Sequence, residues 1–162
     1  MNDRYLFRGK RIDNGEWVIG WFCMTDPKPF TKKSYPAIIC KETNFVETIE
    51  PETTGQCTEV EDKNKRLIFK GDIVNYDLLG EPYIGIVKYG KFVQDGSGGE
   101  YGGSDCLGFY IERIKVVLRE WEDGDDVEWR EKDYQKTVSI LEAEKIEIIG
   151  NIHDNPDLLN NN

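Results

Sequence analysis

The chain contains a single histidine, His153, and its four cysteines are separated from one another by at least 16 other residues. Structural zinc sites usually take ligands in close pairs such as C-x₂₋₄-C, because one tight turn supplies two of them. No such pair is present, so the sequence predicts no metal site. It also carries no motif for a cofactor, and we expect none.

Long apolar runs are missing as well. A membrane-spanning helix needs about 18 or more consecutive apolar residues, and no segment reaches that length. The opening residues lack the basic and apolar regions of a secretory signal. We therefore expect a cytoplasmic protein, with no membrane partner, whose cysteines are reduced thiols.

Basic residues are outnumbered by acidic residues, 21 to 31, which gives a formal net charge of −10. Residues 1–75 hold 12 basic and 12 acidic residues, whereas residues 76–162 hold 9 and 19. The excess of negative charge therefore belongs to the C-terminal half. Such a field repels phosphate groups and anionic lipid surfaces, so composition disfavours generic binding to nucleic acid or membranes.

The remaining pattern is that of a β protein. Asn14-Gly15 tolerates the positive φ angles of a tight turn, and the flanking apolar runs predict a hairpin with strands at 4–9 and 16–23. Pro27 and Pro29 predict a loop, and residues 59–66 predict a turn. Further strands are expected at 37–40, 45–49, 67–69, 72–76, 83–89, 109–118, 137–140 and 145–149.

At 162 residues the chain has the length of one ordinary domain. We expect a single domain over residues 1–162, with a frayed tail at 160–162. Its fold is predicted to be mainly β, with an SH3-like or partly open barrel over about 45–118, flanked by the N-terminal hairpin. Asn155 before Pro156 predicts a short C-terminal helix.

Two surfaces are candidates for binding. The first is an acidic cluster with embedded tryptophans, formed by Trp121, Glu122, Asp123, Asp125, Asp126 and Trp129. Its carboxylates suit a basic protein partner, and they lack the spacing of a calcium-binding EF-hand. The second combines cations and an aromatic residue, as single-stranded nucleic-acid sites do: Arg8, Lys10, Arg11 and Trp17.

Weaker candidates have simpler structural explanations. Cys57 and His153 could form a thiol–base pair, but the sequence does not show that they meet. The glycine-rich residues 95–105 lack the lysine of a phosphate-binding loop and predict a mobile hairpin tip. Asp72, after Gly71, is expected to cap backbone amides in a turn. An aromatic platform could be built from Trp17, Trp21, Tyr83 and Tyr89, although core packing is the commoner use.

Several ordered motifs resemble the YopX family of phage and prophage proteins. They are Arg4-Tyr-Leu-Phe-Arg8, Trp17-Val-Ile-Gly20, Pro51-Glu-Thr-Thr-Gly-Gln-Cys-Thr58, Asp62-Lys-Asn64, Ile68-Phe-Lys-Gly-Asp-Ile-Val74, Gly85-Ile-Val-Lys-Tyr89 and Ile149-Gly-Asn-Ile-His-Asp-Asn-Pro-Asp-Leu-Leu159. The resemblance implies a mainly β fold and an origin in a phage or prophage of a bacterial host. It implies no activity and no catalytic residue. Family members commonly have an aromatic residue at Cys57 and tyrosine at His153, which argues against a shared catalytic role for either.

These observations favour a non-enzymatic accessory protein that binds a host or phage protein, or a second copy of itself. The alternative is a single-stranded nucleic-acid-binding module in the N-terminal half.

Overall fold

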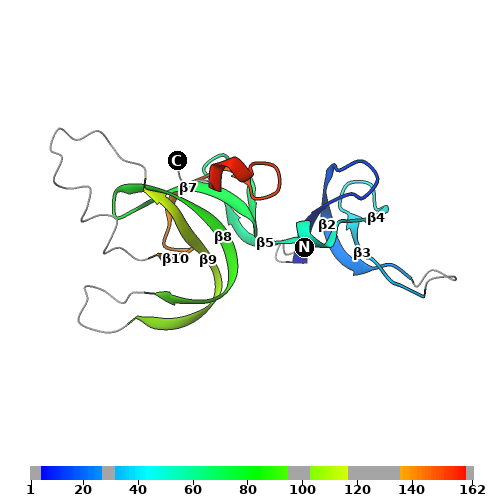
Figure 1. The fold of residues 1–162 in the computed structure, drawn as a ribbon, viewed down its shortest axis with the longest axis horizontal. Helices are drawn as coiled ribbons and strands as arrows, with labels where there is room; N and C mark the ends of the chain where they lie inside the picture. The colour runs from blue at the N-terminus through cyan, green and yellow to red at the C-terminus, as the bar shows by residue number, and fades with distance from the viewer. Residues whose placement is uncertain (1–4, 27–31, 95–102, 117–135, 160–162) are drawn as a thin grey trace. The chain divides into compact units, whose positions relative to one another are not determined.

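The computed structural model describes residues 5–26, 32–94, 103–116 and 136–159. These residues form antiparallel sheets, and the chain divides into two compact units, Met1–Glu59 (unit 1) and Val60–Asn162 (unit 2) (Figure 1). This division does not test whether residues 1–162 form a single domain, which stays a prediction. Among the described residues, no helix is long and apolar enough to cross a membrane.

Unit 1 is built on the predicted hairpin. Strand β1 (Leu6–Lys10) pairs with β2 (Trp17–Met24), and the turn between them places Gly15 at φ 73°. This confirms the Asn14-Gly15 turn prediction. The sheet continues through β3 (Pro36–Cys40) and β4 (Val46–Thr48), and a 3₁₀ turn, η2 (Pro51–Thr53), follows.

The small core of unit 1 contains Val18, Ile38 and Ile49, with Phe7 and Cys40 packed against it. Glycine is needed on β2 because the backbone of β3 comes very close. A Cβ atom at Gly20 would lie 1.9 Å from the carbonyl oxygen of Ile39.

Strand β5 (Gly55–Glu61) runs from unit 1 into unit 2, and it pairs with β1 at Gly55 and Gln56. The hydrogen-bonded order of the first sheet is β4-β3-β2-β1-β5-β6, with β6 at Leu67–Phe69. The sequence did not predict β5. It contains Glu59 at φ 67°, a conformation that side chains rarely adopt in a strand.

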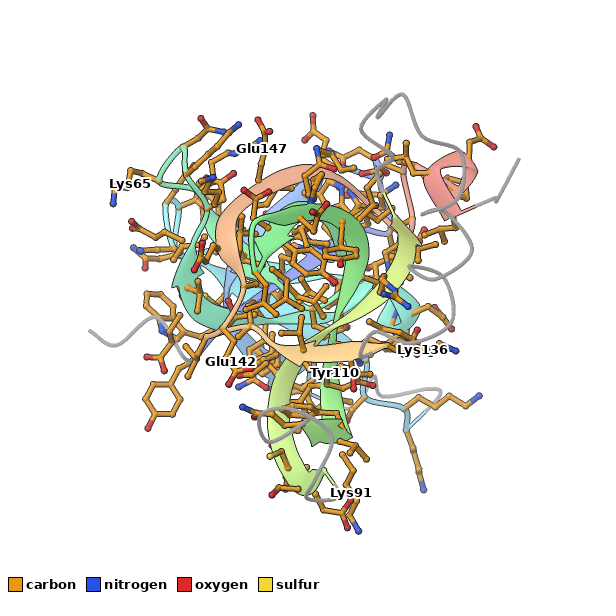
Figure 2. The ribbon with its side chains drawn as sticks, turned by 90° about the vertical axis from the view of Figure 1, so that its left-hand side faces the viewer. Lys65, Lys91, Tyr110, Lys136, Glu142 and Glu147 are labelled. Carbon is orange, nitrogen blue, oxygen red and sulfur yellow. The ribbon has the colours of Figure 1, made fainter. Side chains whose placement is uncertain are left out.

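Unit 2 contains a second antiparallel sheet of order β10-β9-β8-β7-β11. Its strands curve around the side chains of a larger core (Figure 2). The strands are β7 (Asp72–Leu78), β8 (Glu81–Gln94), β9 (Ser104–Val116), β10 (Thr137–Ser139) and β11 (Glu144–Asn151). The core includes Ile68, Val74, Tyr76, Val87, Ile111, Val138 and Ile146.

The barrel predicted over about 45–118 is not a closed barrel in the part of the chain that the structure describes. The second sheet begins at β10 and ends at β11, and these two edge strands do not pair with each other. The predicted C-terminal helix is also wrong. Residues Pro156–Leu159 form only a 3₁₀ turn, η3, in which Leu158 donates to the carbonyl of Asn155 at 3.1 Å.

The reason for the missing helix lies in Asn155. Its side-chain oxygen accepts the backbone N–H of Asn151, 3.2 Å away, and so is not used to cap a following helix. The side chain fits there because residue 150 is glycine. A Cβ atom at Gly150 would lie 2.5 Å from that oxygen.

Candidate functional site

The predicted basic and aromatic residues of unit 1 come together in part. Arg8 and Lys10 are two residues apart on β1, so their side chains share one face of the sheet. Trp17 lies directly opposite Lys10 on β2. The guanidinium carbon of Arg8 is 4.9 Å, and the Lys10 ammonium nitrogen 5.5 Å, from the centre of the Trp17 ring. Both are cation–π distances.

Arg11 does not join this cluster. Its guanidinium donates to Asp13 at 2.7 Å and lies 3.2 Å from a carboxylate oxygen of Glu47. The hydrogen bond from Arg11 lowers the pKa of Asp13. An open pocket of about 480 Å³ lies nearby, lined by Ile12, Asp13, Tyr35, Val46, Glu47 and Thr48.

The acidic cluster lies outside the described residues. This applies to every member of the predicted interaction surface, namely Trp121, Glu122, Asp123, Asp125, Asp126 and Trp129. Most of the glycine-rich segment, residues 95–102, lies outside them too. The prediction of an acidic protein-binding surface therefore stays a prediction.

The proposed thiol–base pair has no accessible nucleophile. The side chain of Cys57 is fully buried, and its sulfur accepts the backbone N–H of Glu59 at 3.5 Å. His153 belongs to a turn of unit 2, where its backbone N–H donates to the side chain of Asn151. In the ranges that the structure describes, no group of three or more His, Cys, Asp and Glu residues is placed to hold a metal ion.

The four aromatic residues of the predicted platform are divided between the two units. Trp17 and Trp21 lie on the same face of β2, whereas Tyr83 is a core residue of unit 2 with 6% exposure. Tyr89 belongs to the same strand as Tyr83 but is 51% exposed. Within unit 1 the two tryptophans share a face, and within unit 2 only Tyr89 of the two tyrosines is exposed.

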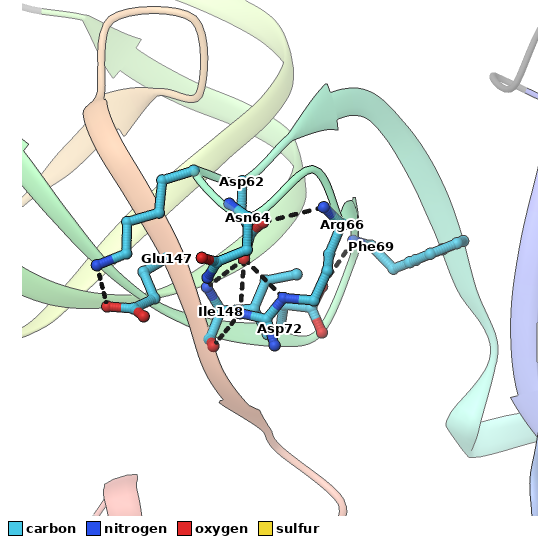
Figure 3. A network of polar contacts seen from close by, with 8 residues as sticks. Asp62, Asn64, Arg66, Phe69, Asp72, Glu147 and Ile148 are labelled. Carbon is cyan, nitrogen blue, oxygen red and sulfur yellow. Dashed lines mark hydrogen bonds and ion pairs between the residues drawn. The ribbon is translucent and has the colours of Figure 1, made fainter.

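A buried carboxylate, Asp62, organises one end of unit 2 (Figure 3). One of its oxygens accepts the backbone N–H groups of Asn64 and Arg66 at 2.8 and 3.0 Å. The other binds the Arg66 guanidinium at 2.6 Å and accepts the N–H of Ile148 on β11 at 3.2 Å. The Arg66 guanidinium also donates to the carbonyl of Ile148 at 2.8 Å.

These contacts set the protonation of Asp62. Burial alone would raise its pKa, but the hydrogen bonds from Arg66, Ile148 and Asn64 outweigh burial and hold the pKa far below its usual range. Asp62 is therefore a charged structural clamp. Sequence reasoning noted Asp62-Lys-Asn64 only as part of a motif, although an Asp that bonds to the amide two residues later is a common turn signal.

Asp72 has the turn role that the sequence predicted. Its side chain is fully buried, and one carboxylate oxygen accepts the backbone N–H of Phe69 at 2.7 Å. The adjacent Gly71 accepts the N–H of Ile152 through its carbonyl, at 3.0 Å. The turn before β7 is thus joined to the segment after β11.

A second open pocket, of about 540 Å³, is lined in unit 2 by residues of β7, β8 and β11 together with Lys63. Two ion pairs are among its lining residues: Lys63 with Glu147 and Lys145 with Asp77, each at 2.8 Å. Each of these four charges thus has an opposite charge beside it, and partly exposed ion pairs of this kind contribute little to stability.

The most distinctive surface is an arm made by the distal parts of β8 and β9. The register pairs Val87 with Ile111 in the core, and the same face continues outward through Tyr89, Leu107 and Val93. These three side chains are 51%, 69% and 51% exposed. We call this row, Tyr89, Val93 and Leu107, the apolar stripe.

The opposite face of the arm is well packed. Gly90 and Gly108 pair with each other and leave that face bare, so the ring of Phe92 reaches Tyr110 and stacks on it at 5.1 Å. Thr137 donates its hydroxyl to the carbonyl of Val93 at 2.9 Å, and the Gln94 amide donates to Glu142. The arm is therefore held in place as far as Gln94.

Comparison with known proteins places the chain by family. The family model described as YopX protein matches residues 6–160, and the chain belongs to this family. No curated protein and no solved structure matches the chain. Two of the segments that carry the resemblance meet in unit 2, where the N–H of Ile152 donates to the carbonyl of Gly71, and the Asp62 clamp holds Ile148, the residue before the second segment. The contacts of Asp62 and Gly71 thus stabilise the fold of unit 2.

Proposed function

We propose that this YopX protein is a non-enzymatic binding protein that associates with another protein surface through the apolar stripe of the β8–β9 arm. The observation that supports this most strongly is the exposure of Tyr89, Val93 and Leu107 on one face of a strand pair that is otherwise tightly held. Contiguous exposed apolar residues on a folded surface are typical of interaction sites.

The form of the arm suits this role. Its packed face fixes the backbone through Phe92 and Tyr110, so little conformational entropy is lost when the stripe is covered. On the same face, Lys91 lies between Tyr89 and Val93 and opposite Leu107, and Asp105 lies opposite Val93, so the stripe also offers a cation and an anion to a partner. The partner is a host or phage protein, or a second copy of this chain.

The test compares two variants of unit 2. Leu107→Glu places a charge in the stripe, whereas Leu79→Glu places the same charge at an exposed leucine in the turn between β7 and β8. Tagged wild-type protein and both variants are used to recover partners from host lysate, and each purified chain is sedimented over a range of concentrations. We expect Leu107→Glu alone to lose the partner or to shift towards monomer. Equal behaviour of the two variants would contradict the proposal.

A further inference from the structure

A second binding surface lies in unit 1 and is independent of the arm. We propose that the β1–β2 face carrying Arg8, Lys10, Trp17 and Trp21 binds single-stranded nucleic acid. The register fixes which side chains share this face: Lys10 lies opposite Trp17, Arg8 opposite Ile19, and Leu6 opposite Trp21. Side chains directly opposite each other in an antiparallel pair point to the same side.

The cations on this face come from neighbouring positions of one strand. The Cα atoms of Arg8 and Lys10, two residues apart on an extended strand, are separated by about 6.6 Å. Consecutive phosphates of an extended single strand have a similar separation, so two long side chains rooted at this spacing can reach adjacent phosphates. Both cations lie against the Trp17 ring, at 4.9 and 5.5 Å, so their side chains are held in place before a ligand arrives.

Aromatic and apolar groups lie next to the cations. Trp21 is partly exposed, and Ile19, between the tryptophans on β2, is 40% exposed. Base stacking on aromatic side chains tolerates any sequence, because every base has a π-face. Lys41 follows β3 beside Ile19, to whose carbonyl it donates its backbone N–H at 2.9 Å, and it adds a third cation near this row.

The four strands β1–β4 contain few acidic residues. The only acidic residue in β1–β4 is Glu47, which by strand alternation and register lies on the other face, where it meets Arg11. Glu16, beside Trp17 in the chain, is hydrogen-bonded by Asn14 at 2.8 Å. The face therefore presents cations next to aromatic rings, which matches phosphates next to bases.

The charge of the whole chain does not exclude this ligand. Residues 1–59 hold 8 basic and 9 acidic residues, whereas residues 60–162 hold 13 and 22. Unit 1 is thus close to neutral by sequence, and local contacts on the face decide the interaction. We expect modest affinity that falls steeply with salt, since phosphate binding releases counterions.

The test uses the full chain and a short fluorescent oligothymidylate, followed by anisotropy at several salt concentrations. Arg8→Gln with Lys10→Gln is compared with Arg11→Gln, which also removes a cation but from the other face of the sheet. Circular dichroism checks that each variant is folded. We expect wild type and Arg11→Gln to bind alike, and the double variant to lose at least about tenfold in affinity at low salt.

Two further readouts separate this ligand from a general polyanion. The slope of log K against log salt should become less negative by about 0.7 for each phosphate that is no longer neutralised, so by about 1.4 in the double variant. Trp21→Ala should weaken oligonucleotide binding but leave any binding of polyglutamate unchanged, because only bases stack. The proposal is overturned by absence of binding at low salt, by equal losses in Arg11→Gln and the double variant, or by polyglutamate binding as tightly as the oligonucleotide.

Discussion

The carboxylate of Asp62 accepts the backbone N–H of Ile148, 86 residues later in the chain, at 3.2 Å. This bond joins the turn after β5 to the middle of β11. The same carboxylate is paired with Arg66 at 2.6 Å and has no solvent exposure. One buried charge therefore links this turn to a strand far along the chain, and the stability of unit 2 should depend on it.

Asp62→Asn should destabilise the protein by about 3 kcal/mol, because it weakens several charge-assisted hydrogen bonds and leaves Arg66 without its buried counter-charge. Urea unfolding measures the change. The matched control is Glu147→Gln, which removes the Lys63 pair, whose side chains are 50% and 34% exposed. That change should cost less than about 1 kcal/mol. Equal losses of stability in the two variants would contradict the proposed role of Asp62 as a buried structural clamp.

The free energy of unfolding should also depend on pH because of Asp62. The pKa of Asp62 is far lower in the folded chain than in the unfolded chain, where it is about 3.9. The unfolded state therefore binds the proton first, and the stabilisation is complete above about pH 5 and is lost as the pH falls through 4 and below. Urea midpoints measured from pH 7 to acid should show this loss in wild type. In Asp62→Asn the acid dependence should be visibly smaller, and an unchanged profile would contradict this assignment.

In unit 1 the close approach of β2 and β3 gives a sharp prediction. Gly20→Ala would place a Cβ atom 1.9 Å from a backbone oxygen, so the strands must separate, at a cost on the order of 3 kcal/mol. Amide hydrogen exchange of β2 and β3 should rise strongly. Gly108→Ala is the control, since no atom lies within 4 Å of its Cβ position. Comparable exchange in the two variants would contradict the register between β2 and β3.

Local chemistry made much of unit 1 predictable. Asn14-Gly15 sets the hairpin without help from distant residues, and the two strands lie within a residue or two of their predicted bounds. Side chains alternate between the two faces of a strand, so Arg11 lies on the face opposite to that of its neighbour Lys10. The grouping of Arg8, Lys10 and Trp17 was thus accessible from sequence, but the grouping with Arg11 was wrong.

Other features depend on contacts that no local pattern contains. Asn155-Pro156 resembles a helix start, but the side-chain oxygen of Asn155 accepts the backbone N–H of Asn151 and does not cap a helix. The sequence predicts a strand at 83–89, and nothing in it shows that β8 continues past the core to Gln94 as an exposed arm. The Asp62 clamp requires a partner 86 residues away. Tertiary contacts decided each of these cases.

The turn after β11 offers a test of such a contact. Gly150→Ala would bring a Cβ atom to 2.5 Å from the Asn155 side-chain oxygen, which must then move and release the N–H of Asn151. We expect a loss of about 1–3 kcal/mol in urea unfolding. Asn155→Ala should cost less in the Gly150→Ala background than in wild type, because the two changes remove one shared contact. Strict additivity would show that the contact does not form.

The proposed association of the arm with another protein can be tested by photocrosslinking in cells that express the chain. A benzoylphenylalanine residue is placed at position 107 in the apolar stripe or, in a matched protein, at position 79 in the β7–β8 turn, where the native leucines are 69% and 84% exposed. Binding through the stripe predicts a discrete crosslinked species from position 107 and none from position 79. No crosslink from position 107, or the same species from both positions, would contradict it.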